Sequence, residues 1–184
     1  NVRFIINDNQ VKESKSYLDR AFFVQQLLLD NDENKAKRFS LYTNSKVSPL
    51  QQCYVTGNAD NLNIEWPNPD KLLNTSFYSF NVTDKDRVSS ITSISPNKFK
   101  IDIETSGPQF LVISEIYYPN GWYATLNGKY IDIFEVNDLI RGVFIDSSGT
   151  HSVEMYFSPS DLRWGSTISW ISFFIIFTMI FSKR

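Results

Sequence analysis

A single histidine limits the acid–base and metal chemistry available to this chain of 184 residues. His151 has Ser152 and Glu154 as neighbours, but these three do not make a catalytic triad. The sequence also lacks the G-x-S-x-G, P-loop, G-x-G-x-x-G and H-E-x-x-H patterns. We therefore expect no catalytic residue, no metal site and no cofactor, and we interpret His151 as an ordinary strand histidine near a hairpin end.

Composition argues against two further classes of site. Cys53 is the only cysteine, so neither an internal disulfide nor a cysteine metal cluster can form, and the role of Cys53 stays open. The net charge is −2, and no cluster of Lys and Arg is interleaved with aromatic residues. Nucleic-acid binding therefore has no electrostatic support.

One carboxylate lies in the most apolar stretch of the chain. Glu115 falls within the run from 110 to 118, and burying a lone carboxylate is costly unless it is paired. Arg141, in the run from 139 to 145, is the expected partner. We interpret the pair as an ion pair that fixes how strands dock, with a polar anchor in a ligand groove as the alternative.

Four aromatic residues surround a bend and are the candidate ligand-binding residues. Aromatic clusters on the loops of β-sandwiches often stack on sugar rings, and equally often form core around a bend. Both interpretations remain open from the sequence. The residues are Tyr117, Tyr118, Trp122 and Tyr123, on either side of Pro119-Asn120-Gly121.

The run from 110 to 157 should position these residues. Asn127-Gly128 favours a two-residue type I′ hairpin between strands at 121–126 and 129–136. With further strands at 139–145 and 150–157, the pattern predicts a four-stranded antiparallel meander. The run from 110 to 118 is apolar on both faces and should be a central strand.

The rest of the chain predicts more short strands. Residues 98–104 alternate strictly between apolar and charged side chains, as in a strand with one face exposed to solvent. Residues 61–66 favour a strand, and residues 30–42 a short helix. About ten strands with turns every 8 to 12 residues predict an all-β, antiparallel, jelly-roll-like β-sandwich domain over residues 1–160.

A segment without charge or proline follows the predicted sandwich. Residues 165–182 would form about 27 Å of helix, close to the thickness of a bilayer core. Trp164 and Arg163 flank one end, and Lys183-Arg184 the other. We predict a transmembrane helix over residues 161–184 with a short basic cytoplasmic end, which places residues 1–160 on the outer side. The alternative is a buried helix of a soluble core.

The start of the chain predicts a missing upstream part. Residues 1–6 already favour a strand, with no initiator Met and no signal peptide before them. We therefore expect a fragment of a longer protein.

Several motifs occur together in this chain, at residues 20–24, 111–119, 121–122, 127–128, 139–143 and 149–154. They resemble the C-terminal region of the YfhO family of bacterial membrane proteins. That family typically reads L-S-E-x-Y-Y-P-G-W, D-G, R-G-V and G-x-H-x-V-E before a last transmembrane helix, and carries R-A-F-F-V further upstream. Two departures are an inserted Asn120 and Asn127 in place of Asp.

The resemblance implies a role as part of a larger membrane protein. YfhO-like proteins resemble lipid-linked-sugar glycosyltransferases that act on cell-envelope polymers such as lipoteichoic acid. Their catalytic carboxylate lies in an early loop that this chain does not contain. The resemblance thus implies a non-catalytic extracytoplasmic domain and last anchor, with the lipid bilayer, the upstream transmembrane bundle and envelope glycan or lipid-linked sugar as partners. A membrane-anchored carbohydrate-binding module and a purely structural sandwich are the alternatives.

Overall fold

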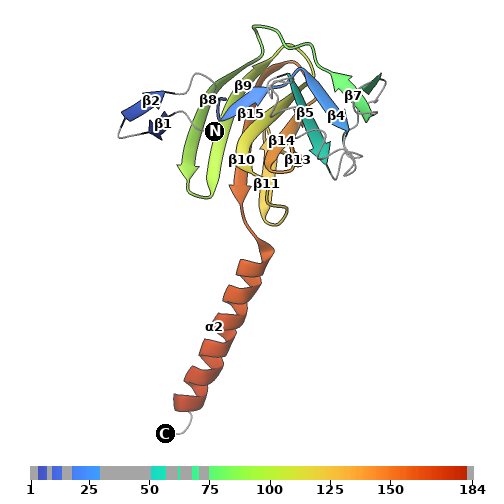
Figure 1. Cartoon of the computed structure of the whole chain (residues 1–184). Coiled ribbons are helices and arrows are strands. Elements are labelled where there is room, and N and C mark those ends of the chain that lie inside the picture. The colour runs from blue at the N-terminus through green and yellow to red at the C-terminus, as the bar shows by residue number, and fades with distance from the viewer. Residues whose placement is uncertain are drawn as a thin grey trace.

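The computed structural model describes residues 4–7, 10–13, 18–29, 51–56, 62, 68–70 and 75–181. Most of the described strands gather into one body, and the helix of the described residues leads away from it toward the C-terminus (Figure 1). The predicted helix at 30–42, the predicted strand at 61–66 apart from Leu62, and Lys183-Arg184 lie outside the described residues.

The smaller of two large sheets has five antiparallel strands, in the order β12-β11-β15-β9-β8. Asn127 and Gly128 both have positive φ, 51° and 85°, which confirms the predicted hairpin turn between β11 and β12. The strands are β8 (Arg87–Ser95), β9 (Lys98–Thr105), β11 (Trp122–Leu126), β12 (Lys129–Ile131) and β15 (Gly149–Phe157).

The larger sheet has the order β3-β10-β14-β13-β5-β4-β7-β6. Its pairs are antiparallel, as predicted, except β4 with β5, which run parallel. The strands are β3 (Ala21–Phe23), β4 (Gln26–Leu29), β5 (Gln52–Thr56), β6 (Asn68–Asp70), β7 (Thr75–Ser79), β10 (Gln109–Ile116), β13 (Phe134–Val136) and β14 (Ile140–Ile145). A separate hairpin pairs β1 (Phe4–Asn7) with β2 (Gln10–Glu13).

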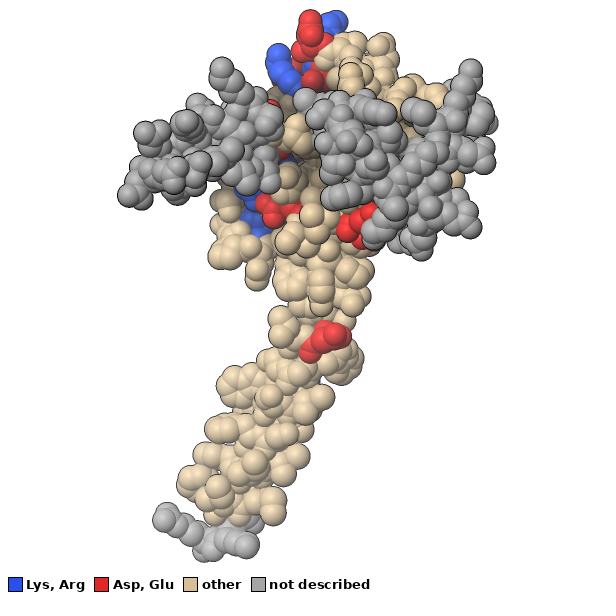
Figure 2. All heavy atoms as spheres, in the orientation of Figure 1, with Lys and Arg blue, Asp and Glu red and all other residues tan. Residues whose placement is uncertain are grey.

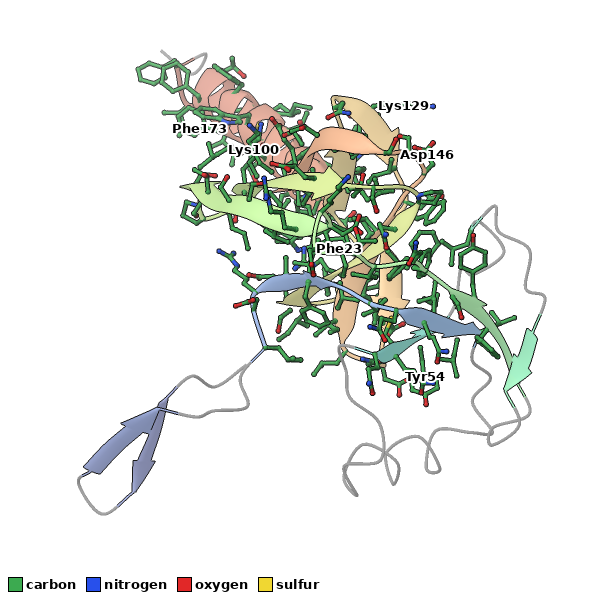
Figure 3. All side chains as sticks on the ribbon, turned by 90° about the horizontal axis from the view of Figure 1, so that it is seen from above. Phe23, Tyr54, Lys100, Lys129, Asp146 and Phe173 are labelled. Carbon is green, nitrogen blue, oxygen red and sulfur yellow. The ribbon has the colours of Figure 1, made fainter. Side chains whose placement is uncertain are left out.

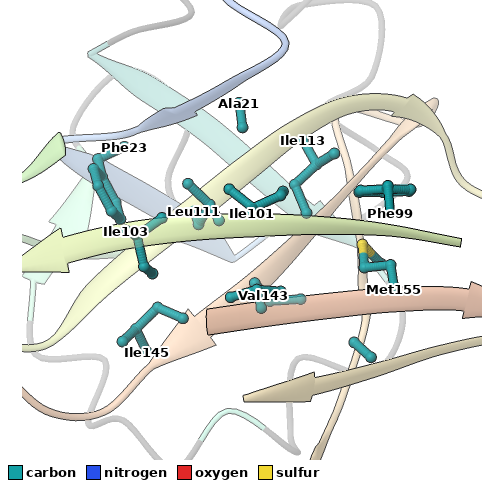
Figure 4. Packing of buried hydrophobic residues seen from close by; sticks show 12 residues of the cluster. Ala21, Phe23, Phe99, Ile101, Ile103, Leu111, Ile113, Val143, Ile145 and Met155 are labelled. Carbon is teal, nitrogen blue, oxygen red and sulfur yellow. The ribbon is translucent and has the colours of Figure 1, made fainter. Parts of the chain in front are cut away.

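The main core lies between the two sheets. Phe99, Ile101 and Ile103 of β9 face inward and alternate with half-buried charged residues, as the sequence predicts. They pack against Leu111 and Ile113 of β10 from the opposite sheet (Figure 4). The arrangement confirms the all-β, sandwich-like fold.

A second core covers the other face of the larger sheet. Phe110 and Val112 of β10 are fully buried there beside Phe134 and Val136 of β13, and Cys53 joins the same cluster. Since β10 is buried on both faces and pairs with β3 and β14, the predicted central strand is confirmed. Burial raises the pKa of the Cys53 thiol well above its usual range, so this thiol is an inert core group.

The predicted meander was wrong. The run from 129 to 136 is two strands, because β12 belongs to the smaller sheet and β13 to the larger one. In one unbroken strand, the exposed Tyr130 and Asp132 would share a face with the buried Phe134 and Val136. The break at residues 132–133 removes this conflict by carrying the chain from one sheet to the other.

Helix α2 (Ser160–Phe181) begins five residues before the predicted uncharged segment and is long and apolar enough to cross a membrane. Ser169 and Thr178 donate their hydroxyl hydrogens to the carbonyls of Gly165 and Ile175, both at 2.9 Å, so these hydroxyls are satisfied within the helix. The described side chains of the helix are exposed, and none belongs to a core cluster of the described chain. This exposure contradicts the alternative of a buried helix in a soluble core.

Candidate functional site

The structure brings the four predicted aromatic residues to one hollow. Tyr117 and Tyr118 follow β10, and Trp122 and Tyr123 begin β11, so the bend between these strands places them together. All four line a hollow of about 360 Å³, here called the aromatic hollow. Tyr118 and Tyr123 are exposed, whereas Tyr117 and Trp122 are half-buried.

Two further tyrosines complete this surface. Tyr123 stacks on Tyr156 of β15, with ring centroids 5.5 Å apart, and meets Tyr130 of β12 edge-on at 6.5 Å. The Tyr156 hydroxyl donates to the Tyr130 hydroxyl at 2.8 Å, and this hydrogen bond, together with partial desolvation, raises the pKa of Tyr156. The sequence argument missed both residues, although the hairpin register and the alternation of β15 place them on the face of Tyr123.

Arg141 lies against Trp122 from inside the sandwich. Its guanidinium carbon is 4.1 Å from the centroid of the indole ring, and the residue is only 3% exposed. Nη2 donates to the carbonyl of Ile116 at 2.9 Å, while no described residue accepts a hydrogen bond from Nε or Nη1. Burial lowers the pKa of Arg141, the nearby Glu115 carboxylate opposes this shift, and the charge of Arg20 adds to it.

Glu115 does not form the predicted ion pair with Arg141. Its carboxylate pairs instead with Arg20, at 2.7 Å, and both side chains are partly exposed. Across β14, Arg141 stands opposite Ile113, and the ladder is irregular between Ile113 and Ile116, so the expected pairing with Glu115 is lost. Arg20 directly precedes β3, which pairs with β10 on the side opposite β14, and the Arg20 carbonyl accepts from the amide of Ser114. The sequence argument missed Arg20 as the partner of Glu115.

The network continues through the main core. The Arg20 guanidinium lies 5.1 Å from the ring centroid of Phe99, and Phe99 in turn lies 6.0 Å from Trp122. A chain of contacts therefore joins the surface pair Arg20–Glu115 to the ring that lines the aromatic hollow. Because the pair is partly solvated, its own contribution to stability is about 0–1 kcal/mol.

The bend that carries the aromatics also holds the start of α2. Phe157 at the end of β15 packs on Trp122, with ring centroids 5.4 Å apart, and the amide of Ser158 donates to the carbonyl of Gly121 at 2.6 Å. Gly121 has a φ of 99°, and a Cβ there would lie 2.8 Å from the Cβ of Pro159. Only glycine fits this contact without strain. The aromatic hollow therefore opens beside the root of the helix.

His151 has a structural environment, as the sequence predicts. Its Nε2 lies 3.1 Å from the carbonyl oxygen of Ser147, which can only accept, so Nε2 carries the proton. Nδ1 then accepts from the amide of Asn127 at 3.1 Å. No group of three or more His, Cys, Asp or Glu side chains in the described part of the chain is placed to hold a metal ion.

Comparison with known proteins agrees with the resemblance seen in the sequence. The family described as "Bacterial membrane protein YfhO" matches residues 1–169. Neither a curated protein nor a solved structure matches the chain. Since the match covers the strands and the first part of α2, the chain belongs to the YfhO family of bacterial membrane proteins.

Proposed function

We propose that the β-sandwich is an extracytoplasmic carbohydrate-binding domain and that the aromatic hollow is its binding site. The observation that carries this proposal is the convergence of Tyr117, Tyr118, Trp122 and Tyr123 on one hollow. Aromatic faces offer flat apolar surfaces to the C–H faces of a sugar ring, and Asp132 on the rim supplies a hydrogen-bond acceptor for hydroxyl groups. Envelope glycan and lipid-linked sugar both present this chemistry.

Helix α2 is proposed as the membrane anchor, with its C-terminal end in the cytoplasm. The basic pair Lys183-Arg184 follows the apolar segment, and positive residues favour the cytoplasmic side. The hollow would then face the outer surface of the membrane, close to the headgroups. Family membership supports membrane association, and the orientation rests on the charge bias alone.

For the full-length protein we propose a glycosyltransferase that acts on cell-envelope polymers. This activity rests on the family resemblance, which implies that the catalytic carboxylate lies in another part of the protein. The sandwich would present the acceptor or the lipid-linked sugar to a catalytic part elsewhere in the protein. The upstream transmembrane bundle is then its neighbour in the bilayer.

A binding experiment tests the site itself. The 184-residue chain, inserted in lipid nanodiscs, is applied to an array of mono- and disaccharides that includes envelope sugars. We expect binding that Tyr118→Ala and Tyr123→Ala each weaken about three- to tenfold, because each removes one exposed ring from the hollow. Ile94→Ala trims an apolar side chain on β8 that is as exposed as Tyr118 but lies outside the hollow, and it should leave binding unchanged.

A second candidate function is a brace for the transmembrane bundle. The contacts among Phe157, Ser158 and Gly121, which hold the root of α2, favour it. A brace would show no glycan binding on the array. It would instead show lower membrane accumulation of the full-length protein when Gly121→Ala weakens the contact.

A further inference from the structure

Three hollows on this side of the sandwich share their walls. The aromatic hollow shares Tyr130, Ile131 and Asp132 with a hollow of about 430 Å³, here called the distal hollow. It shares Trp122 and Tyr123 with a hollow of about 300 Å³, here called the helix-side hollow, which reaches Ser160 and Asp161 of α2. The three therefore form one continuous row from the root of the helix to the far end of the sandwich.

The row follows the open edge of the smaller sheet. Strand β12 is the last strand in the order β12-β11-β15-β9-β8, and among the described strands it pairs only with β11, so none of them covers its other side. The path along β11 from Trp122 to Leu126 covers four residue steps, roughly 13 Å at the usual rise of a strand. This length exceeds one sugar ring and suits an extended chain.

The charges along the row select against an anionic chain. Asp161 lines the helix-side hollow, Asp132 lines the aromatic hollow, and Asp146 lines the distal hollow. Lys129 is the one basic residue among the described lining residues, and Figure 3 shows Lys129 and Asp146 on the same side of the sandwich. With three carboxylates and one ammonium, the row carries a net negative charge that would repel a polyanion. The carboxylates can accept hydrogen bonds from the hydroxyl groups of an uncharged ligand.

We infer that the row binds an extended, uncharged glycan of several sugar units. One end of this glycan lies beside α2 and the other in the distal hollow. The inference rests on the proposed carbohydrate-binding function and adds the length and the charge class of the ligand. The aromatic hollow would hold a central unit by ring stacking, and the carboxylates would hold the units on either side.

A ladder of uncharged oligosaccharides tests the inference. The chain in nanodiscs is titrated with β-1,4-glucose, α-1,4-glucose and β-1,4-N-acetylglucosamine oligomers, each from the dimer to the hexamer. For the ladder that binds, we expect affinity to rise about tenfold from dimer to hexamer, since longer chains reach the distal hollow. The double variant Lys129→Ala/Asp146→Asn should remove most of this gain and leave dimer binding unchanged.

Matched variants and a charged probe sharpen the result. Lys85→Ala/Asp84→Asn changes an exposed ammonium and an exposed carboxylate outside the row and should keep the gain with length. If the dimer binds and longer oligomers bind no more tightly, the extended site is overturned and the proposed function still stands. Tighter binding of a polyanionic ladder, such as oligogalacturonate, would overturn the charge class. If no ladder binds at any length, both the inference and the proposed function fall.

Discussion

Arg141 lies directly behind Trp122, with its guanidinium carbon 4.1 Å from the indole centroid, so a buried cation supports the ring that lines the aromatic hollow. Two of its nitrogens find no acceptor among the described residues, and burial already lowers its pKa. The ring contact and the bond to the Ile116 carbonyl offset part of that cost. Arg141 is thus a positioning residue for Trp122.

Truncating Arg141 should destabilise the sandwich. Arg141→Ala removes the stack on Trp122 and leaves the Ile116 carbonyl without its donor, so we expect a loss of about 2–3 kcal/mol in the free energy of unfolding. Arg141→Met keeps most of the volume without burying a charge and should lose less. Urea unfolding in detergent micelles, followed by tryptophan fluorescence, measures both.

The exposed pair of Arg87 and Glu104 provides the comparison for this prediction. Arg87→Ala breaks an ion pair of 2.7 Å between two exposed side chains and should cost less than about 1 kcal/mol. Equal losses for Arg87→Ala and Arg141→Ala would show that the stack on Trp122 contributes nothing.

Gly121→Ala should be far more costly than Gly107→Ala. At residue 121 the new Cβ meets Pro159 at 2.8 Å and the backbone has a φ of 99°, so we expect a loss of about 2–4 kcal/mol. At residue 107 nothing lies within 4 Å of a new Cβ, and the change should be within about 1 kcal/mol of neutral. Thermal unfolding of the two variants side by side checks the difference, and similar melting temperatures would contradict it.

Asp86 should make stability depend on acid pH. Partial burial raises the pKa of its carboxyl, but hydrogen bonds from the amides and hydroxyls of Ser106 and Thr83, at 2.6–3.0 Å, lower it more, so the net pKa lies below 3.8. Because the pKa of Asp86 is lower in the folded state than in the unfolded state, its ionised carboxylate stabilises the folded state above the unfolded pKa. This stabilisation is lost as the pH falls through the folded pKa. The protein with Asp86 should therefore have a higher free energy of unfolding than Asp86→Asn at neutral pH, and this difference should shrink below about pH 3.8.

Urea midpoints at pH 7 and at pH 2.5 measure this change. Asp84→Asn alters an exposed carboxylate two residues away, outside this set of hydrogen bonds, and serves as the control. An advantage over Asp86→Asn that stays constant across the range would contradict the account.

Labelling in intact cells tests the proposed orientation. Cys53 is fully buried, so a cysteine introduced at the exposed Ser93 would be the reactive thiol of the sandwich. We expect a membrane-impermeant maleimide to label Ser93→Cys in whole cells and to label Lys183→Cys only after lysis. The reverse pattern would place the sandwich in the cytoplasm.

Strands in which apolar and polar side chains alternate strictly were predictable from the sequence. The alternation of β9 and the Asn127-Gly128 turn depend on neighbours in the chain, and both match the structure. The four aromatics were found because they flank one bend. Contacts set by sheet packing were not predictable: Arg20 reaches Glu115 across 95 residues, and the chain changes sheets after β12.

Only Ser158 and Pro159 separate β15 from α2, which follows it after a short link (Figure 1). The amide of Ser158 is hydrogen-bonded to the carbonyl of Gly121. The first turn of α2 carries one acidic residue, Asp161. Figure 2 shows red acidic atoms near the start of the helix, with tan surface around them. A tether this short allows little freedom to swing or to rise from the lipid surface. Once α2 is embedded, the sandwich would contact only the layer immediately above the headgroups. Molecules anchored in the same bilayer would therefore reach it far more often than molecules that diffuse in from the medium.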